Sequence, residues 1–185
     1  MLRDFEHRLC VVVPVEDIKG SRECPGSSVI KSLFNHLTYM KATEDCGYFL
    51  KVTVVKRVGN GKLLNSSNYI LFPVTFCSLN FLPKTGEVLD GIVIYVCRNG
   101  VFLQCGPMNS VYLSVRKMPK YNFVSGENPF FLRDDQSRIE KEVAVRFKVI
   151  AMRWSATHRK FDVLASIEGD SLGPISLNGF DGLEL

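Results

Sequence analysis

The sequence predicts a small α+β domain over residues 1–82, followed by an all-β barrel over residues 83–185. Three observations support this division. A stripe of apolar residues at helical spacing lies between residues 27 and 43, among segments that read as strands. The run Pro83-Lys84-Thr85-Gly86 has the composition of a joint. Beyond it, short apolar runs alternate with turn residues, which is typical of an all-β domain.

The first domain opens with RLCVVVPV (8–15), a short β-branched run ended by a proline, which predicts a buried strand. The next segment, EDIKGSRECPGSS, reads as a loop, and Ser27 or Ser28 can cap a helix that extends to about Thr43. Apolar residues recur along this helix every three or four positions, so we expect this face to pack in the core. The stripe consists of Val29, Leu33, Leu37 and Met40.

The rest of the first domain reads as strands. Residues 47–56 alternate well enough for one strand, and Gly59-Asn60-Gly61 is a strong turn signal after it. SSNYILFPVTFCSLNF (66–81) predicts one or two more strands. Pro73 marks a bend or an edge there, because proline cannot donate a ladder hydrogen bond.

The second domain contains five predicted strands. A long connection, KMPKYNFVSGENPFFLRDDQSRI (117–139), separates the third from the fourth and reads as a loop rich in Pro, Gly, Asn and Asp. Five strands with one long connection at this place describe an OB-type barrel. The tail GPISLNGFDGLEL (173–185) looks irregular. The predicted strands are Val88–Val96, Val101–Cys105, Val111–Val115, Glu142–Trp154 and Phe161–Ile167.

Charge and cysteine content limit the possible functions. The formal net charge is +4, but residues 168–185 hold four acids and no Lys or Arg, so residues 1–167 carry 23 basic and 15 acidic residues, a net +8. A basic body is compatible with nucleic acid without requiring it. The six cysteines form no CxxC pair, which argues against a metal site and favours a reducing compartment. We also expect no cofactor, no membrane span and no secretory signal.

The middle of the chain carries a recognisable pattern. GIVIYVCRNGVFL (91–103), with VYLS (111–114) later, resembles the start of an S1 RNA-binding domain, G-x-V-x-x-V/I-x-x-F-G-A-F-V followed by an apolar-His-apolar-Ser step. In S1 domains the aromatic residues face outward and bases stack on them. The resemblance therefore implies an S1-like barrel with Phe102 and Tyr112 as stacking residues. Basic residues that would neutralise phosphates, if they cluster, are Arg98, Lys117, Arg153 and Lys160.

Two positions depart from the S1 pattern. Asn99 stands where S1 domains have an aromatic residue, and losing one stacking group, worth roughly 1–3 kcal/mol per base, predicts weaker RNA binding. Asparagine at this position also fits a turn that needs a positive φ. Arg153 stands where S1 domains commonly have an acid. For Phe102 a core position and for Tyr112 a plain exposed strand position remain open.

The resemblance extends over residues 1–176. LFPVTF (71–76), FLPKTGEVLDGIV (81–93), GVFLQCGPM (100–108) and EGDSLGPI (168–175), in this order, resemble the seventh subunit of eukaryotic RNA polymerase II. KATEDCGYFL (41–50), YNFVSGENPFF (121–131) and LASIEGDSLGP (164–174) are more similar to its plant paralogues in RNA polymerases IV and V, which transcribe for RNA-directed DNA methylation in gene silencing.

This resemblance implies a nuclear, non-catalytic stalk subunit of a DNA-directed RNA polymerase. The first domain, called the tip, would dock to the large polymerase subunits, with Gly59-Asn60-Gly61-Lys62 as the docking loop. Leu71, Phe72 and Pro73 would contact a fourth-subunit homologue. The second domain would contact nascent single-stranded RNA. No Ser/His/acid set, P-loop or HExxH motif points to an enzyme.

Several alternatives stay open on the sequence alone. The chain could be the equivalent subunit of RNA polymerase II, a free-standing S1 protein of RNA processing or translation, or an interaction scaffold without RNA contact. A subunit should expose an apolar strip on its first domain, whereas a free S1 protein needs none. Residues 59–62 also fit a plain hairpin turn, and residues 71–73 also fit the domain core.

Overall fold

A computed structural model describes residues 2–19, 25–38, 42–64 and 68–175. The chain forms two compact units, and the boundary lies between Leu82 and Pro83, where the predicted joint begins. Met40 of the predicted helical stripe, Cys24 and the tail from residue 176 lie outside the described residues.

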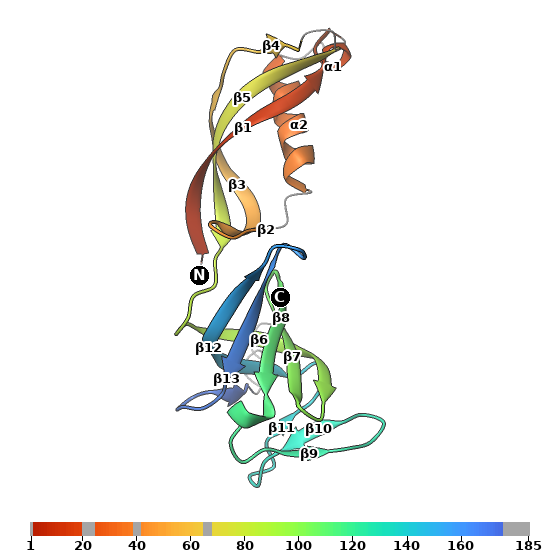
Figure 1. Cartoon of the computed structure of the whole chain (residues 1–185), viewed down its shortest axis with the longest axis vertical. Coiled ribbons are helices and arrows are strands. Elements are labelled where there is room, and N and C mark those ends of the chain that lie inside the picture. Colours follow the sequence, from red (N-terminus) through yellow and green to blue (C-terminus); the bar gives the residue numbers. More distant parts are fainter. Residues whose placement is uncertain (1, 20–24, 39–41, 65–67, 176–185) are drawn as a thin grey trace, which may run out of the picture. The chain divides into compact units, whose positions relative to one another are not determined.

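The first unit contains an antiparallel sheet with one long strand at its centre (Figure 1). Strand β5 pairs with β1 along its whole length on one side, and with β3 and then β4 on the other. Strand β2 pairs with the far side of β3. The strands are β1 (Leu2–Pro14), β2 (Ala42–Thr43), β3 (Gly47–Val58), β4 (Lys62–Leu63) and β5 (Tyr69–Phe81).

Strand β1 is longer and less buried than predicted. It starts at Leu2 rather than at residue 8, and it ends at Pro14. Val11 and Val13 are buried, whereas Val12 between them is 48% exposed. Successive side chains of a strand point to opposite faces, and among the described residues helices cover one face of this sheet, so an unbroken valine run is only half buried.

Helix α2 (Pro25–Thr38) covers that face, as Figure 1 shows. Val29, Leu33 and Leu37 are buried, which confirms the predicted core stripe for these three residues. They form one apolar cluster with the buried residues Val11, Val13, Val74 and Phe76 of the sheet.

The predicted limits of the helix were wrong. A short helix, α1 (Val15–Lys19), occupies part of the predicted loop, and α2 begins at Pro25, where a proline is well tolerated because the first turn has no partner for its N–H. The hydroxyl of Ser28 donates to the carbonyl oxygen of Asp17 at 3.0 Å, rather than serving as the cap. The helix ends at Thr38, and Thr43 pairs with Gly47 as part of β2.

The Gly59-Asn60-Gly61 segment is a bulge, not the hairpin turn that the sequence suggested. Strand β3 pairs with β5 as far as Val58 opposite Val74, and β4 resumes with Lys62 opposite Leu71. The chain therefore keeps its direction, and three residues lie opposite two, so the segment carries the one extra residue that characterises a bulge.

Pro73 explains why the bulge lies there. It sits in the central strand rather than at an edge, and the N–H of Gly59 donates to its carbonyl oxygen at 2.7 Å. The nitrogen and oxygen of one strand residue point to the same neighbour, so the N–H that proline lacks would have faced β3 and β4. The bulge removes the need for that donor.

The second unit contains a closed barrel, which confirms the predicted barrel of five strands (Figure 1). The strand order is β13-β8-β7-β6-β12, and β12 pairs back onto β13 to close the ring. The pairing of β8 with β13 is parallel and the other pairings are antiparallel. The strands are β6 (Val88–Cys97), β7 (Gly100–Cys105), β8 (Met108–Ser114), β12 (Ala144–Ser155) and β13 (Lys160–Ser166), with β14 (Gly173–Pro174) beside β12.

The barrel interior is filled by alternate residues of each strand. Side chains that are less than 2% exposed include Val93, Leu103, Leu113 and Phe147. Their neighbours in sequence point outward, as the period of two requires. The residues at the outward positions do not fill the barrel core, so they can form a binding site on its surface.

The predicted long loop between the third and fourth barrel strands is in fact a folded insertion. A 3₁₀ turn, η1 (Val115–Lys117), leads into a three-stranded sheet of β9 (Asn122–Val124), β10 (Phe130–Leu132) and β11 (Arg138–Ile139). Tyr121, Phe131 and Ile139 are buried in it. The strands have two or three residues each, too few for alternation to be recognised in the sequence.

Gly100 is the glycine on which the β7–β8 pairing most depends. Its φ is 152°, and a Cβ placed on it would lie 2.2 Å from the carbonyl oxygen of Leu113. We expect Gly100→Ala to lower the free energy of unfolding of the barrel unit by roughly 2–4 kcal/mol, because backbone must move and the φ becomes strained. Urea unfolding followed by the fluorescence of Trp154, the one tryptophan of the chain and a β12 residue, reports on this unit.

Gly126 provides the matched control for this substitution. A methyl group there would meet nothing within 4 Å, and its φ is not positive. Gly126→Ala should change the free energy of unfolding by less than about 0.5 kcal/mol. Equal effects of the two substitutions would contradict the role given to Gly100.

Candidate nucleic-acid interface

Three aromatic side chains lie in a row on the outer surface of the barrel. Phe102 on β7 is the cross-strand partner of both Tyr95 on β6 and Tyr112 on β8. The ring centroids are 6.2 Å apart for Tyr95 and Phe102, and 5.0 Å apart for Phe102 and Tyr112. Tyr95 is 60% exposed and the other two are half-buried, so the row offers ring surface to solvent on which bases could stack.

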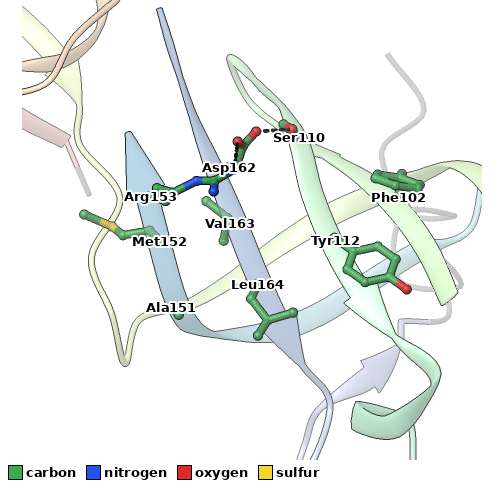
Figure 2. Close-up of a pocket in the computed structure, with 9 residues that line it drawn as sticks. All are labelled: Phe102, Ser110, Tyr112, Ala151, Met152, Arg153, Asp162, Val163 and Leu164. Atoms are coloured by element: carbon green, nitrogen blue, oxygen red, sulfur yellow. Dashed lines mark hydrogen bonds and ion pairs between the residues drawn. The ribbon is translucent and has the colours of Figure 1, made fainter. Parts of the chain in front are cut away.

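The row continues into an apolar groove at the seam between β8 and β13. Tyr112 lies opposite Leu164, which in turn lies opposite Ala151 on β12. The groove has a volume of about 440 Å³, within the range of small-ligand sites. Figure 2 shows the residues that line it, which are Phe102, Ser110, Tyr112, Ala151, Met152, Arg153, Asp162, Val163 and Leu164.

A polar cluster forms one end of this groove. Asp162 and Arg153 are cross-strand partners, and a guanidinium nitrogen of Arg153 lies 3.3 Å from Oδ2 of Asp162 (Figure 2). The hydroxyl of Ser110 donates to Oδ1 at 2.9 Å, and Nζ of Lys160 donates to that hydroxyl at 3.1 Å. The hydrogen bond from Ser110, followed by that from Arg153, holds the pKa of Asp162 below its usual range. Asp162 is therefore an ionised acceptor at neutral pH.

Tyr112 is held in place from the β6–β7 turn. Its hydroxyl donates to the carbonyl oxygen of Asn99 at 2.7 Å, and this oxygen also accepts from the N–H of Val115 at 2.9 Å. Asn99 does not have the positive φ that was one explanation for an asparagine there, because Gly100 takes that conformation instead. The backbone carbonyl at position 99 thus helps to position Tyr112.

The structure brings four of the six predicted RNA-binding residues together. Phe102, Tyr112 and Arg153 line the groove, and Lys160 reaches it through Ser110. The remaining two lie elsewhere, because Arg98 sits in the exposed β6–β7 turn and Lys117 sits on η1.

Part of the positive charge is neutralised within the unit. Lys117 pairs with Glu168 at 2.9 Å, and Arg153 pairs with Asp162. The six predicted residues therefore do not form one strongly basic surface. The groove end has one net positive charge from Arg153, Lys160 and Asp162 together.

The predicted contact residues of the first unit lie beside one another. A Cβ on Gly59 would lie 2.7 Å from the ring of Pro73, and a Cβ on Gly61 would lie 2.7 Å from the ring of Phe72. Phe72 packs against the apolar cluster under α2, whereas Leu71 and Pro73 point to the opposite face. The two predicted sets thus belong to one end of one sheet.

Sequence reasoning missed Tyr95 and Asp162. Tyr95 follows a register shift between Val93 and Tyr95, and this shift changes which residues of β6 face outward. Nothing in the local sequence marks that bulge. Asp162 could have been found, because the turn after Ser155 fixes the β12–β13 hairpin register and places Asp162 opposite Arg153.

Among the residues that the structure describes, no three His, Cys, Asp or Glu side chains gather as metal ligands would. The described cysteines, which are Cys10, Cys46, Cys77, Cys97 and Cys105, are free thiols.

No helix in the described ranges has both the length and the apolar character needed to cross a bilayer.

Comparison with known proteins agrees with the geometry. The chain is 39% identical to Arabidopsis thaliana DNA-directed RNA polymerase V subunit 7 over 166 residues, covering 90% of this chain and 93% of that protein. It is 40% identical to polymerase IV subunit 7 of the same plant over 164 residues, covering 89% and 94%. Polymerase II subunit 7 of that plant is 30% identical over 132 residues, covering 70% and 73%.

Two other comparisons add little. No protein-family model matches the chain. A solved structure assigned as an exosome complex RNA-binding protein aligns over 52% of this chain and 49% of that chain, with 24% identity and a TM-score of 0.37. This likeness is too weak to carry an argument.

A closed five-stranded barrel with an outward aromatic row defines an OB-type barrel protein. The three sequence relatives cover between 70% and 90% of the chain, and all three are named as subunit 7 of their polymerase. The chain belongs to the subunit 7 family of DNA-directed RNA polymerases.

The lowered pKa of Asp162 gives a test of the polar cluster. Because the folded state holds this pKa below the ordinary value of 3.8, the ionised carboxylate stabilises the fold above that pH, and the contribution is lost as the pH falls through the lowered pKa. Asp162→Asn should lower the stability of the barrel unit at pH 7 by less than about 1 kcal/mol, since solvent screens the pair. The difference from the unmodified chain should shrink below about pH 4.

Urea unfolding followed by Trp154 fluorescence, repeated between about pH 7 and pH 3, measures this difference. A difference that stays constant across this range would show that the charge of Asp162 does not stabilise the fold.

Proposed function

We propose that this chain is a subunit 7 of a plant silencing polymerase, RNA polymerase IV or V, which serve RNA-directed DNA methylation. The proposal rests on one observation: the chain is more similar to the subunits of polymerases IV and V than to the subunit of polymerase II. Identity is 39–40% over 89–90% of the chain for the subunits of polymerases V and IV, but 30% over 70% for the polymerase II subunit. The role would be that of a non-catalytic stalk subunit in the nucleus.

An apolar end of the first unit supports a subunit rather than a free protein. Val12 is 48% exposed, Leu63 is 66% exposed and Tyr69 is 47% exposed, all at the end of the sheet that carries the Gly59–Gly61 bulge. Isolated apolar side chains on a surface are ordinary, but a group at one end of a sheet is typical of a protein contact. We propose that this end, with residues 59–62, Leu71 and Pro73, docks to the large polymerase subunits and to a fourth-subunit homologue.

Nascent RNA is the ligand that we propose for the barrel. The row of Tyr95, Phe102 and Tyr112 supports this, because stacking on aromatic rings is the usual means by which OB barrels hold single strands. The groove beside the row has the size for a base and ends in cationic groups that could attract phosphates. Because Arg153 and Lys160 at this end both lie within 4 Å of Asp162, which offsets part of their charge, we expect modest rather than tight binding.

Removal of the stacking rings tests the RNA contact. We expect Phe102→Ala and Tyr112→Ala each to weaken binding of fluorescein-labelled heptauridine by about 5- to 150-fold, since stacking is worth roughly 1–3 kcal/mol per base. Fluorescence anisotropy with the full chain measures the affinity. Tyr69→Ala, which removes an exposed aromatic side chain of the first unit, should leave it unchanged. Unchanged affinity in the Phe102 and Tyr112 variants would favour a scaffold without RNA contact.

Purification from plant cells tests the subunit assignment. The tagged chain should bring down a fourth-subunit homologue and the largest subunit of polymerase IV or V, identified by mass spectrometry. Leu63→Asp should reduce this recovery several-fold, because it places a charge in the proposed contact. Val88→Asp, at a 50% exposed position of the barrel unit, serves as the control. Recovery of only ribosomal or RNA-processing proteins would point instead to a free S1 protein.

A further inference from the structure

Building on the RNA contact proposed above, we infer that Asp162, together with Arg153, selects guanine at the end of the barrel groove. The two residues form the polar end of an otherwise apolar groove, as Figure 2 shows. A base lying on the apolar part would present one polar edge to them. The hydrogen bonds that the pair already makes determine which donors and acceptors this edge must present.

The position of Asp162 suits contact with a base edge. It precedes Leu164 by two residues on β13, so their Cα atoms are roughly 7 Å apart and both side chains point to the groove. Leu164 lies opposite Tyr112, which provides the stacking surface. A base stacked on Tyr112 and Leu164 can therefore direct its edge along β13 toward the carboxylate.

The carboxylate retains acceptor capacity on both oxygens. An ionised carboxylate has about four lone-pair sites, two on each oxygen. Ser110 occupies one site on Oδ1, and Arg153 occupies one on Oδ2. Lys160 lies 3.8 Å from Oδ1, which is beyond hydrogen-bond distance. Each oxygen therefore keeps one site that can accept a hydrogen bond from a ligand.

Guanine is the base that fits two adjacent acceptors. Its Watson–Crick edge presents N1–H and the 2-amino group next to each other, and bases in single strands are read on this edge. Uracil has one N–H between two carbonyl oxygens, which a carboxylate repels. Adenine and cytosine each present one amino group beside an acceptor nitrogen. Asp162 thus gains two hydrogen bonds from guanine and at most one from the other bases.

Arg153 adds to the same preference. Its side chain is 83% exposed, and its single hydrogen bond to Asp162 leaves other N–H groups free to face O6 of guanine. A phosphate is excluded from the immediate contact of Asp162 by like charge. The sugar-phosphate backbone of the RNA therefore lies on the outer side of Arg153 and Lys160, and the base points into the groove.

Three labelled heptamers test the selection in the full chain. They are heptauridine, the same RNA with guanosine at its centre, and the same RNA with inosine there, which lacks the 2-amino group. We expect the guanosine RNA to bind at least about fivefold more tightly than heptauridine, and the inosine RNA to lose most of this gain. Fluorescence anisotropy at one fixed salt concentration gives the three affinities.

Two variants locate the effect. Asp162→Asn should abolish the preference for guanosine, because an amide replaces one acceptor with a donor. Asp90→Asn is the matched control, since Asp90 forms an equivalent cross-strand pair with Arg146 but does not line the groove. It should leave the preference intact. The inosine comparison uses the unmodified chain, so it tests the contact with the 2-amino group even if Asp162→Asn impairs folding.

The outcomes separate this inference from the proposed function. Equal affinity for heptauridine and the guanosine RNA, with both dependent on Phe102 and Tyr112, would overturn the guanine selection and leave the RNA contact standing. Equal affinity for guanosine and inosine RNA would also overturn it. Absence of binding to any of the three would remove the RNA contact itself, and the selection with it.

Discussion

The parallel pairing of β8 with β13 is the constraint on which the barrel and its site depend. It joins Val111 to Val163, Tyr112 to Leu164 and Leu113 to Ala165, and it completes the ring that the antiparallel hairpins leave open. Val111, Val163, Leu113 and Ala165 point inward and are buried. Tyr112 and Leu164 point outward and form the floor of the groove. The β8–β13 pairing therefore closes the barrel around its core and also forms the groove on the outer surface.

The pairing of β8 with β13 also determines which aromatic and charged side chains meet at the groove. The aromatic residues belong to β6, β7 and β8, whereas Arg153 and Asp162 belong to the β12–β13 hairpin. In the proposed RNA contact, the first group would stack a base and the second would read its edge. The S1 pattern commonly has an acid where this chain has Arg153, and the structure places the acid on the opposite strand, at Asp162.

The first unit shows how a local backbone requirement shapes a surface. Pro73 cannot donate from the centre of the sheet, so the neighbouring strand bulges at Gly59–Gly61 and resumes as β4. The bulge brings glycines against the rings of Phe72 and Pro73, where a side chain would not fit. The sheet end beyond this point exposes apolar residues that α2 does not cover. Residues 59–61 and residues 71–73, which are separate along the chain, thereby lie at the same end of the sheet.

Periodicity in the sequence by itself determined the five barrel strands and the buried face of the helix. Alternation in strands and the three-to-four spacing of Val29, Leu33 and Leu37 follow from local geometry, so they can be recognised without a tertiary structure. The S1-like run likewise indicates Phe102 and Tyr112 as candidate stacking residues from the sequence alone. Strands of two or three residues, such as β9 to β11, are too short to leave such a signal.

Only the tertiary structure decided the composition of the site and the course of the chain at Gly59–Gly61. Tyr95 joins the aromatic row through a register shift that no local pattern marks. Leu164 and Asp162 meet Tyr112 and Ser110 through pairing between strands about 50 residues apart in the chain. Such contacts depend on which strands become neighbours, and that choice is made by burial of the whole core rather than by any one segment.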